Sequence, residues 1–523
     1  MLATLLSATL HGLAGRVVRV EVDVAPGLPG FTIVGLPDAA LSEARERVRG
    51  AIRNAGFVHP PRRITVNLAP AELRKAGASL DLAIAVGILL GSEQVRASPG
   101  RWALVGELSL TGDIRAVPGL LPMVAALVRR GVRRIVVPEE GLAEARLASA
   151  SDVTGVPDLA AAVDAIRTPR SRKRPAPAER VELAGSVEGH PGLVFPEPTG
   201  GDVLPDLAEV RGQLEARRAL EIALAGGHAL LMVGPPGSGK TLLARTVPGL
   251  LPDLDDEAAL AATIVASVAG AGPLTALVRR PPVRMPHHTT SYAAMVGGGP
   301  RVSPGEITLA DQGVLFLDEL PEFGRDVLEA LRQPLEDGRV AIARAGRAQT
   351  FPARVTLIAA MNPCPCGWFG SEHRACSCPA GIPERYVRRI SGPIRDRIDL
   401  WVAMDRVPPI SIVRDARPEP SAEVAVRIAA ARTRQLARPP GRSNGQLSGR
   451  ALRAACGLDA ATERHTVELA DLDGMTARGT ERLLRVARTI ADLEGAARVW
   501  SVHLDEAARY RTPAIGAAER LAS

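Results

Sequence analysis

The sequence predicts an α/β fold with two α/β regions followed by a helical region. Patterns typical of strands and of helices are mixed from Val17 to about Arg167, and they alternate again from Asp206 to about Met404. From Ser421 onward only helical patterns appear. Between the first two regions, the stretch TPRSRKRPAPAER is rich in Pro and Arg, which is typical of an exposed linker. We therefore expect an N-terminal domain over 1–167, a linker over 168–200, an α/β core over 201–405 and a helical domain over 406–523.

Individual elements of the first region follow from their periodicity. Residues 17–24 and 64–68 alternate as strands do, while residues 39–54 and 80–90 have helical spacing. The apolar start MLATLLSATLHGLAG has no Lys or Arg before its apolar run and leads into the alternating RVVRVEVDV. We therefore expect a first strand there and not a signal peptide.

Composition excludes several classes of protein. A chain of 523 residues is too long for one small binding module, and 46% hydrophobic residues exclude general disorder. The net charge is +7, but much of the surplus lies in residues 167–180, so the charge by itself says little about partners. Four of the 5 cysteines fall between 364 and 378, which argues against a disulfide scaffold. With no apolar run of about 18 residues, we expect a soluble cytoplasmic protein with no membrane partner.

The most specific motif is GPPGSGKT, a match to the phosphate-binding pattern G-x-x-x-x-G-K-[ST]. It follows an apolar strand pattern over 228–233 and opens a helical pattern, a context that disfavours a chance match. Glycines let backbone N–H groups approach phosphates, Lys240 reaches the β- and γ-phosphates, and the Thr241 hydroxyl binds Mg²⁺. The predicted cofactors are therefore ATP and Mg²⁺. The predicted nucleotide contacts are Gly234, Pro235, Pro236, Gly237, Ser238, Gly239, Lys240 and Thr241.

Two later strand patterns end in polar side chains that complete a hydrolytic site. One ends in Asp318, which can hold the metal and its water shell, and Glu319, which can orient the attacking water. Alone, such a pair is commonplace on protein surfaces, and the phosphate loop upstream favours the catalytic role. The other ends in Asn362, which either senses the γ-phosphate or is a plain turn residue. Further on, Arg395 and Arg397 either reach ATP on a neighbouring subunit or pair with nearby aspartates on the surface.

Several segments together resemble the magnesium-chelatase-like AAA+ ATPases of the ComM/YifB type, and the similarity extends over nearly the whole chain. They are GPPGSGKT, MPHHTTSYAAMVGGG, PGEITLADQGVLFLDELPEF, LEALRQPLEDG, AAMNPCPCG, SGPIRDRIDL and, near the start, GLPDAALSEARERVRGAIRNAG. The resemblance implies a P-loop AAA+ ATPase core with a C-terminal helical lid. It also implies a ring-forming homo-oligomer, a hexamer, that moves along single-stranded or branched DNA and promotes branch migration in homologous recombination or natural transformation.

The resemblance also assigns roles to particular residues. It implies that Asn362 is sensor 1, Arg397 the finger that acts across a subunit interface, and Arg478 the sensor 2 arginine of the lid. Arg395 stands where the family usually has an apolar residue. Both Arg395 and Arg397 therefore stay candidates for the finger.

Two further elements are candidate DNA contacts. His287 and His288 lie in a glycine-containing insertion between the phosphate loop and Asp318. The stretch RVAIARAGRAQTF alternates around a central Ala-Gly and predicts a hairpin that carries Arg344 and Arg347 near its tip. In a ring, both elements would contact the phosphate backbone without sequence preference. The alternatives are a histidine pair with a structural role and a solvated basic turn.

Four cysteines, arranged as two closely spaced pairs, form a candidate metal site. Cys364, Cys366, Cys376 and Cys378 offer four thiolates for a tetrahedral structural Zn²⁺. One-residue gaps within each pair are tighter than the usual two to four. The alternative is free thiols in a reducing compartment.

The N-terminal region resembles the proteolytic (S5-like) domain of Lon-type proteases, through KAGASLDLAI, GELSLTG and PGLL. Ser79 aligns with the Lon nucleophile, but Leu121 stands where Lon has its lysine, and Lys75 is the remaining lysine candidate. We therefore expect a proteolytically inactive domain. Three other functions compete with a DNA translocase: a chelatase or protein-remodelling motor, an ATP-dependent protease, and a non-enzymatic scaffold, which the hydrolytic residue set disfavours.

Overall fold

A computed structural model describes the chain over residues 1–36, 39–73, 75, 77–97, 100–148, 152–167, 204–272, 274–299, 303–344, 347–372, 374–407 and 418–511. The predicted linker, 168–200, lies outside the described residues. The rest forms two compact units. Unit 1 takes in the described residues of Met1–Leu193, Leu260–Val278 and Gly299–Ser303, and unit 2 those of Val194–Ala259, Arg279–Gly298 and Pro304–Ser523.

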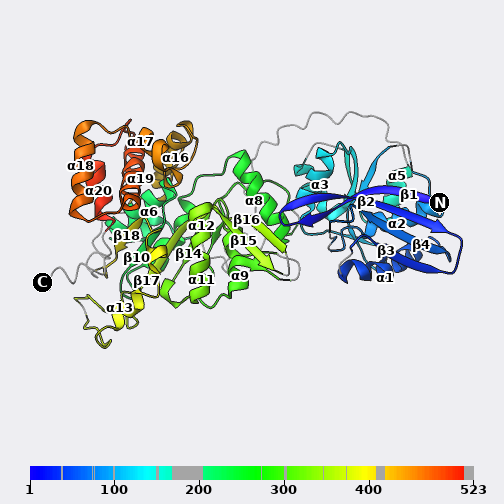
Figure 1. The fold of residues 1–523 in the computed structure, drawn as a ribbon, viewed down its shortest axis with the longest axis horizontal. Helices are drawn as coiled ribbons and strands as arrows, with labels where there is room; N and C mark the ends of the chain where they lie inside the picture. The colour runs from blue at the N-terminus through cyan, green and yellow to red at the C-terminus, as the bar shows by residue number, and fades with distance from the viewer. Residues whose placement is uncertain are drawn as a thin grey trace. The chain divides into compact units, whose positions relative to one another are not determined.

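Unit 1 is built on a seven-stranded mixed sheet in the order β3-β4-β2-β1-β5-β8-β9. Its longest pairing is the antiparallel hairpin of β1 and β2, the two long strands of unit 1 in Figure 1. The predicted first strand and the strands expected at 17–24 and 64–68 are confirmed, and so are the helices expected at 39–54 and 80–90. The strands are β1 (Leu2–His11), β2 (Ala14–Ala25), β3 (Gly30–Val34), β4 (Arg63–Ala69), β5 (Trp102–Leu104), β6 (Glu107–Leu108), β7 (Ile114–Arg115), β8 (Arg134–Pro138) and β9 (Asp152–Val156). The helices of its N-terminal part are α1 (Ala39–Asn54), α2 (Asp81–Gly91), α3 (Leu120–Arg129), α4 (Leu142–Leu147) and α5 (Leu159–Arg167).

Unit 2 is built on a five-stranded sheet in the order β11-β14-β17-β10-β18, and every neighbouring pair is parallel. Its strands are β10 (Leu230–Val233), β11 (Val283–Arg284), β14 (Val314–Leu317), β17 (Thr356–Met361) and β18 (Leu400–Ala403). The three central strands, β10, β14 and β17, are buried along their whole length. A strand covered on both faces needs a continuous apolar run, which is what these segments have.

Short helices and hairpins surround this sheet, and a set of longer helices follows it in the chain. The helices are α6 (Leu214–Gly226), α7 (Lys240–Arg245), α8 (Asp256–Ala269), α9 (Tyr292–Val296), α10 (Glu306–Leu309), α11 (Arg325–Ala330), α12 (Arg332–Asp337), α13 (Ile382–Val387), α14 (Gly392–Arg395), α16 (Ser421–Ala437), α17 (Gly449–Cys456), α18 (Ala460–Leu472), α19 (Ala477–Leu493) and α20 (Ser501–Arg509). The remaining strands are β12 (Gly297–Gly298), β13 (Ser303–Pro304), β15 (Arg339–Arg344) and β16 (Arg347–Pro352). Most of α8, from residue 260 to its end, belongs to unit 1, and so does the segment that follows it up to residue 278. Among the described residues, no helix is both long and apolar enough to cross a membrane.

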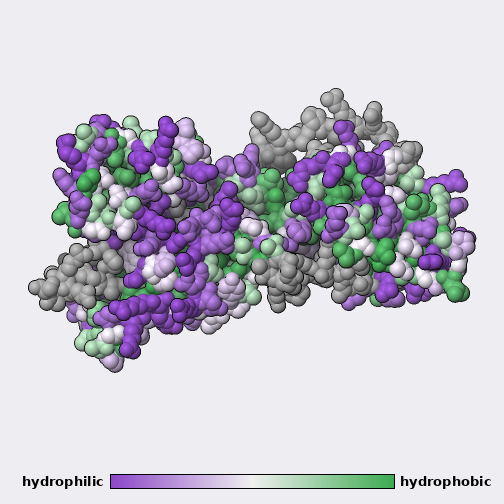
Figure 2. Space-filling view, viewed as in Figure 1, coloured by the Kyte–Doolittle hydropathy of each residue, from purple (hydrophilic) through white to green (hydrophobic). Residues whose placement is uncertain are grey.

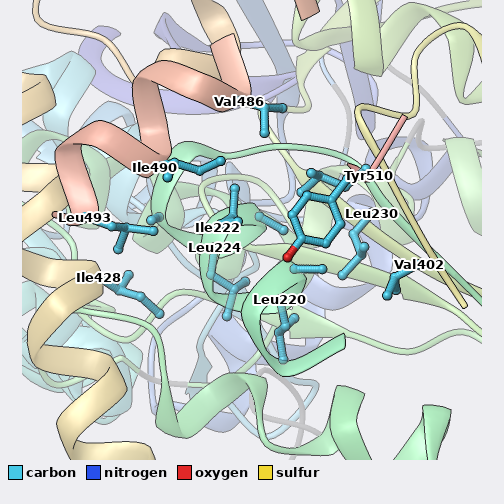
Figure 3. Close-up of a cluster of buried hydrophobic side chains, with 14 of the residues drawn as sticks. Leu220, Ile222, Leu224, Leu230, Val402, Ile428, Val486, Ile490, Leu493 and Tyr510 are labelled. Atoms are coloured by element: carbon cyan, nitrogen blue, oxygen red, sulfur yellow. The ribbon is translucent and has the colours of Figure 1, made fainter. Parts of the chain in front are cut away.

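The C-terminal helices share one hydrophobic core with the sheet of unit 2 (Figure 3). Ile222 and Leu224 of α6 lie between Leu230 of β10 on one side and Ile428 of α16 and Ile490 of α19 on the other. Helix α19 is strongly amphipathic and turns its apolar face to α6 and α16. Figure 2 shows hydrophilic and hydrophobic residues intermixed on the outer face of these helices. The predicted helical region is therefore present, packed directly on the α/β core.

A buried ion pair holds the helical region together. Arg488 and Asp492, both of α19, are almost fully buried, and the guanidinium donates to the carboxylate at 2.9 Å. Asp492 also accepts hydrogen bonds from Arg438, at the end of α16, and from Asn444. A buried carboxylate with three donors fixes the relative positions of the segments that supply them.

We expect Asp492→Asn to destabilise unit 2 by about 3 kcal/mol, because the neutral amide leaves the Arg488 charge buried without its counter-ion. The midpoint of urea-induced unfolding, followed by tryptophan fluorescence, measures this. Asp471→Asn, at an exposed position of α18, is the matched control and leaves the midpoint unchanged. Equal midpoints for the two variants would contradict a structural role for the pair.

Candidate active site

The phosphate-binding sequence forms the loop between β10 and α7, at the carboxyl end of the central strand. Gly239 caps α7 with φ of +91°, a backbone conformation that favours glycine. Gly234 has no space for a side chain, because a Cβ atom there would lie 2.1 Å from the Met404 carbonyl oxygen. The loop therefore depends on glycine both for its turn and for its close packing against the chain after β18.

Lys240 is buried beneath this loop and donates to groups on two strand ends. Its Nζ lies 2.7 Å from the Gly234 carbonyl oxygen, 2.9 Å from that of Pro235 and 3.3 Å from the Asn362 Oδ1. Burial lowers the pKa of Lys240 to about 8, although the charges of Asp318 and Glu319 act in the opposite direction. The structure thus brings together Lys240 and Asn362, which are separated by 122 positions in the chain.

Thr241 and Asp318 form the candidate magnesium site. The Thr241 hydroxyl donates to the Asp318 Oδ2 at 2.7 Å, and the Glu319 backbone N–H donates to Oδ1 at 2.9 Å. Hydroxyl and carboxylate oxygens are the hard ligands that Mg²⁺ prefers, and Mg²⁺ takes its remaining ligands from water and phosphate. These two residues fit a magnesium ion shared with a bound nucleotide.

Glu319 has a contact that sequence reasoning missed. Its Oε2 lies 3.2 Å from the Nδ1 of His288, whose ring in turn lies 4.1 Å from that of His287. Glu319 also has a φ of +53°, which is uncommon for a residue with a side chain and indicates local backbone strain. His288 is thus placed beside the candidate catalytic carboxylate, and its predicted DNA contact stays a prediction. No spacing rule connects the two residues, since they come from different loops.

The predicted finger arginine binds a second carboxylate, and the charge of the predicted sensor 2 arginine acts on the same group. Arg397 donates to Glu336 of α12 and, at 2.6 Å, to the Pro393 carbonyl oxygen. The hydrogen bond from Arg397 lowers the pKa of Glu336, and the charge of Arg478 acts in the same direction. Arg395, the other finger candidate, lines a cavity of about 270 Å³ together with Arg482 and Arg511.

The predicted hairpin is present. Strands β15 and β16 pair antiparallel from Arg339↔Pro352 to Arg344↔Arg347, which puts both arginines at the turn end of the hairpin. The side chains of Arg344 and Arg347 lie outside what the structure describes.

The four clustered cysteines also converge. The Cys364 sulfur lies 3.3 Å from that of Cys366 and 3.7 Å from that of Cys376, and the Cys366 and Cys376 sulfurs are 3.5 Å apart. All four Sγ atoms lie within 4.8 Å of one another. Cys456 is buried on α17, as expected for a core residue.

The lowered pKa of Lys240 predicts a pH dependence of phosphate binding. Anionic phosphate favours the charged lysine, so affinity should fall as the pH rises through about 8, approaching about tenfold for each further pH unit. Fluorescent-nucleotide titrations from about pH 7 to about pH 9.5 measure this. Lys240→Met is the control and should bind weakly with no such slope, while an equal slope in both proteins would rule out Lys240 as its source.

Comparison with known proteins gives matches over most of the chain. Family profiles described as "Subunit ChlI of Mg-chelatase", "Magnesium chelatase, subunit ChlI" and "Magnesium chelatase, subunit ChlI C-terminal" match residues 20–141, 206–412 and 418–511. A more distant match is the DNA replication licensing factor mcm2 of Xenopus tropicalis, 27% identical over 168 residues, which cover 29% of this chain and 17% of that protein.

Two relatives match nearly from end to end. The competence protein ComM of Haemophilus influenzae is 40% identical over 512 residues, which cover 98% of this chain and 97% of that protein. The uncharacterised protein YifB of Escherichia coli is 40% identical over 502 residues, covering 96% and 95%. With the parallel sheet and phosphate loop described above, these matches establish that the chain belongs to the magnesium-chelatase-like AAA+ ATPase family of ComM and YifB.

Proposed function

We propose that this protein is a ring-forming ATPase that moves along DNA and promotes branch migration in homologous recombination or natural transformation. The observation that carries the ATPase part is the convergence of Lys240, Asp318, Glu319 and Asn362 at the carboxyl ends of three neighbouring parallel strands. The DNA part is supported by the near full-length similarity to a competence protein and by the basic hairpin.

Hydrolysis would follow from the side chains at the site. Lys240 and the loop N–H groups hold the β- and γ-phosphates, and Thr241 and Asp318 hold Mg²⁺, which supplies charge neutralisation at the phosphates. Glu319 orients the attacking water, and His288 holds the Glu319 carboxylate at its Oε2. Asn362, fixed by Lys240, senses the γ-phosphate.

Ring assembly would place two arginines near bound nucleotides. Arg397, the family's finger position, is held by Glu336, which Arg478 also influences. We propose that in a hexameric ring Arg397 reaches the nucleotide of the neighbouring subunit while Arg478, as sensor 2 on the first turn of α19, reaches that of its own. The helices α16–α20 then act as the lid.

DNA would contact the insertion and the hairpin in the ring's pore. Arg344 and Arg347 lie at the turn end of β15 and β16, where cationic side chains would bind the phosphate backbone of any sequence. His287 and His288 lie on the insertion, and His288 also touches Glu319. Contact of DNA with this segment would therefore change the position of His288 and, through it, that of the Glu319 carboxylate.

The N-terminal region would be a Lon-like domain without protease activity. The buried Ser79 hydroxyl donates to the Ala8 carbonyl oxygen at 2.9 Å. Lys75 is buried too, and its Nζ donates to the carbonyl oxygens of Gly35 and Pro70. A serine needs a base within hydrogen-bond reach to attack an amide, and Leu121 offers none.

The proposed cofactors are ATP and Mg²⁺, with Zn²⁺ on the four cysteines as a structural ion, and the proposed location is the cytoplasm. A second candidate function is an AAA+ motor subunit of a chelatase, which the description of the matching family profiles favours. Stimulation of ATP hydrolysis by DNA distinguishes the two.

We expect Glu319→Gln to lower ATP turnover by about 10²- to 10⁴-fold, because an amide cannot orient and deprotonate water as a carboxylate does. Nucleotide binding and ring assembly should persist, whereas Lys240→Ala should lose most of the nucleotide affinity itself. Steady-state phosphate release, nucleotide titration and analytical ultracentrifugation measure these quantities. Full turnover in Glu319→Gln would refute the assigned role.

We expect single-stranded or branched DNA to stimulate turnover, and the double substitution Arg344→Glu with Arg347→Glu to remove that stimulation while leaving the basal rate unchanged. Assays at one fixed, moderate salt concentration are needed, because phosphate contacts are salt-sensitive. The double substitution Arg450→Glu with Arg453→Glu, at two exposed positions of α17, is the charge-matched control. No stimulation and no DNA binding in the wild type would favour the chelatase-type motor.

A further inference from the structure

The cysteine cluster has the geometry of a four-sulfur metal site. Four sulfurs placed about 2.3 Å from a tetrahedral Zn²⁺ are separated from one another by about 3.8 Å. The three sulfur pairs among Cys364, Cys366 and Cys376 measure 3.3, 3.5 and 3.7 Å. Such distances exceed a disulfide bond of about 2.05 Å. Each of these three sulfurs lies within 3.7 Å of the other two, as sulfurs around a shared metal do and the two sulfurs of a single disulfide do not.

Backbone N–H groups point at these sulfurs. The Phe369 N–H donates to the Cys364 sulfur at 3.3 Å, and the backbone of Trp368 and of Ser377 hydrogen-bonds Cys366. Donors of this kind offset the negative charge of metal-bound thiolates and fix their orientation. Trp368 and Phe369 lie between the two cysteine pairs and Ser377 lies within the second pair, so backbone on both sides of the loop faces the sulfurs.

This cysteine loop packs directly on the phosphate loop. Gly367 has a φ of +83°, and a Cβ atom there would lie 2.5 Å from the Cδ of Pro236 and 2.8 Å from its Cγ. Cys364, which is fully buried, follows Asn362 by two positions, and Asn362 accepts from Lys240. The cluster therefore contacts the phosphate loop at Pro236 and anchors the strand end that carries Asn362.

A second contact ties the same loop to the chain after β18. The Trp368 ring lies under the guanidinium groups of Arg374, 5.3 Å from its centroid, and Arg406, at 5.9 Å. Arg406 stands two positions after Met404, whose carbonyl oxygen lies against Gly234. The phosphate loop is thus in contact with the cysteine loop at Pro236, and at Gly234 with the chain after β18, which the cysteine loop contacts through Trp368 and Arg406.

We propose that Cys364, Cys366, Cys376 and Cys378 bind one structural Zn²⁺, and that this ion braces the phosphate loop and Asn362 in their active arrangement. The zinc site is argued from the sulfur geometry alone. The bracing role rests on the proposed ATPase function, because ATP turnover is the quantity that reports it. Binding releases the thiol protons and joins the two cysteine pairs across the intervening loop. Loss of the ion would free the Gly367 turn, and with it the surface that supports Pro236.

Metal analysis of the purified full-length chain tests the site. We expect about one zinc per chain in the wild type and in Cys456→Ser, which removes a thiol outside the cluster. The double variant Cys376→Ser with Cys378→Ser should hold none. Wild-type protein without zinc, or with iron in its place, would overturn the proposal, and this measurement on the wild type does not depend on whether the double variant folds.

Gly367→Ala tests the bracing role separately. The added methyl should press on Pro236 and lower ATP turnover by about tenfold or more while zinc is retained, because misplacing a catalytic loop by about 1 Å can cost about 10²-fold. Gly381→Ala is the matched control, since Gly381 has a φ of +80° and nothing within 4 Å of its added Cβ. Equal turnover in the two alanine variants would overturn the bracing role and leave the ATPase standing. If the wild type hydrolyses no ATP, the proposed function fails, and nucleotide affinity in the same variants still decides whether the cysteine loop supports the phosphate loop.

Discussion

The register of three parallel strands is the constraint on which the site depends. Strand β17 pairs with β10 on one side and β14 on the other, with Ile358 opposite both Leu230 and Phe316. Because parallel strands end at the same edge, this register brings the phosphate loop, Asp318 and Asn362 within reach of one another. The Lys240–Asn362 and Thr241–Asp318 distances follow from that pairing.

Charge at the active site is balanced locally. Lys240 is desolvated, which disfavours its ammonium, yet Asp318 and Glu319 lie close enough to favour it. Glu319 in turn meets His288 from the insertion. In a separate group, Arg397 pairs with Glu336, and the charge of Arg478 also lowers the pKa of the Glu336 carboxyl.

The helices that follow the sheet are part of the same folding unit. Residues from α6, α16 and α19 fill one core with the strands, and the buried Arg488 and Asp492 connect α19 to α16. A movement of the helices would therefore repack this core and displace β10. The end of β10 carries the phosphate loop. Direct packing of this kind links helix position to the site through contact, not through a flexible hinge.

The sequence alone determined the local features: the phosphate loop, the strand ends at Asp318 and Asn362, the hairpin around residues 345–346, the alternating strands of the N-terminal region and the C-terminal helices. These depend on periodicity, glycine and apolar runs, which act over short distances along the chain. Only the tertiary structure decided that His288 meets Glu319, that Arg397 binds Glu336, whose pKa the charge of Arg478 also lowers, and that the cysteine loop packs on Pro236. Such contacts join segments far apart in the chain, and they depend on strand order and on the packing of whole elements, for which no local pattern of residues carries a signal.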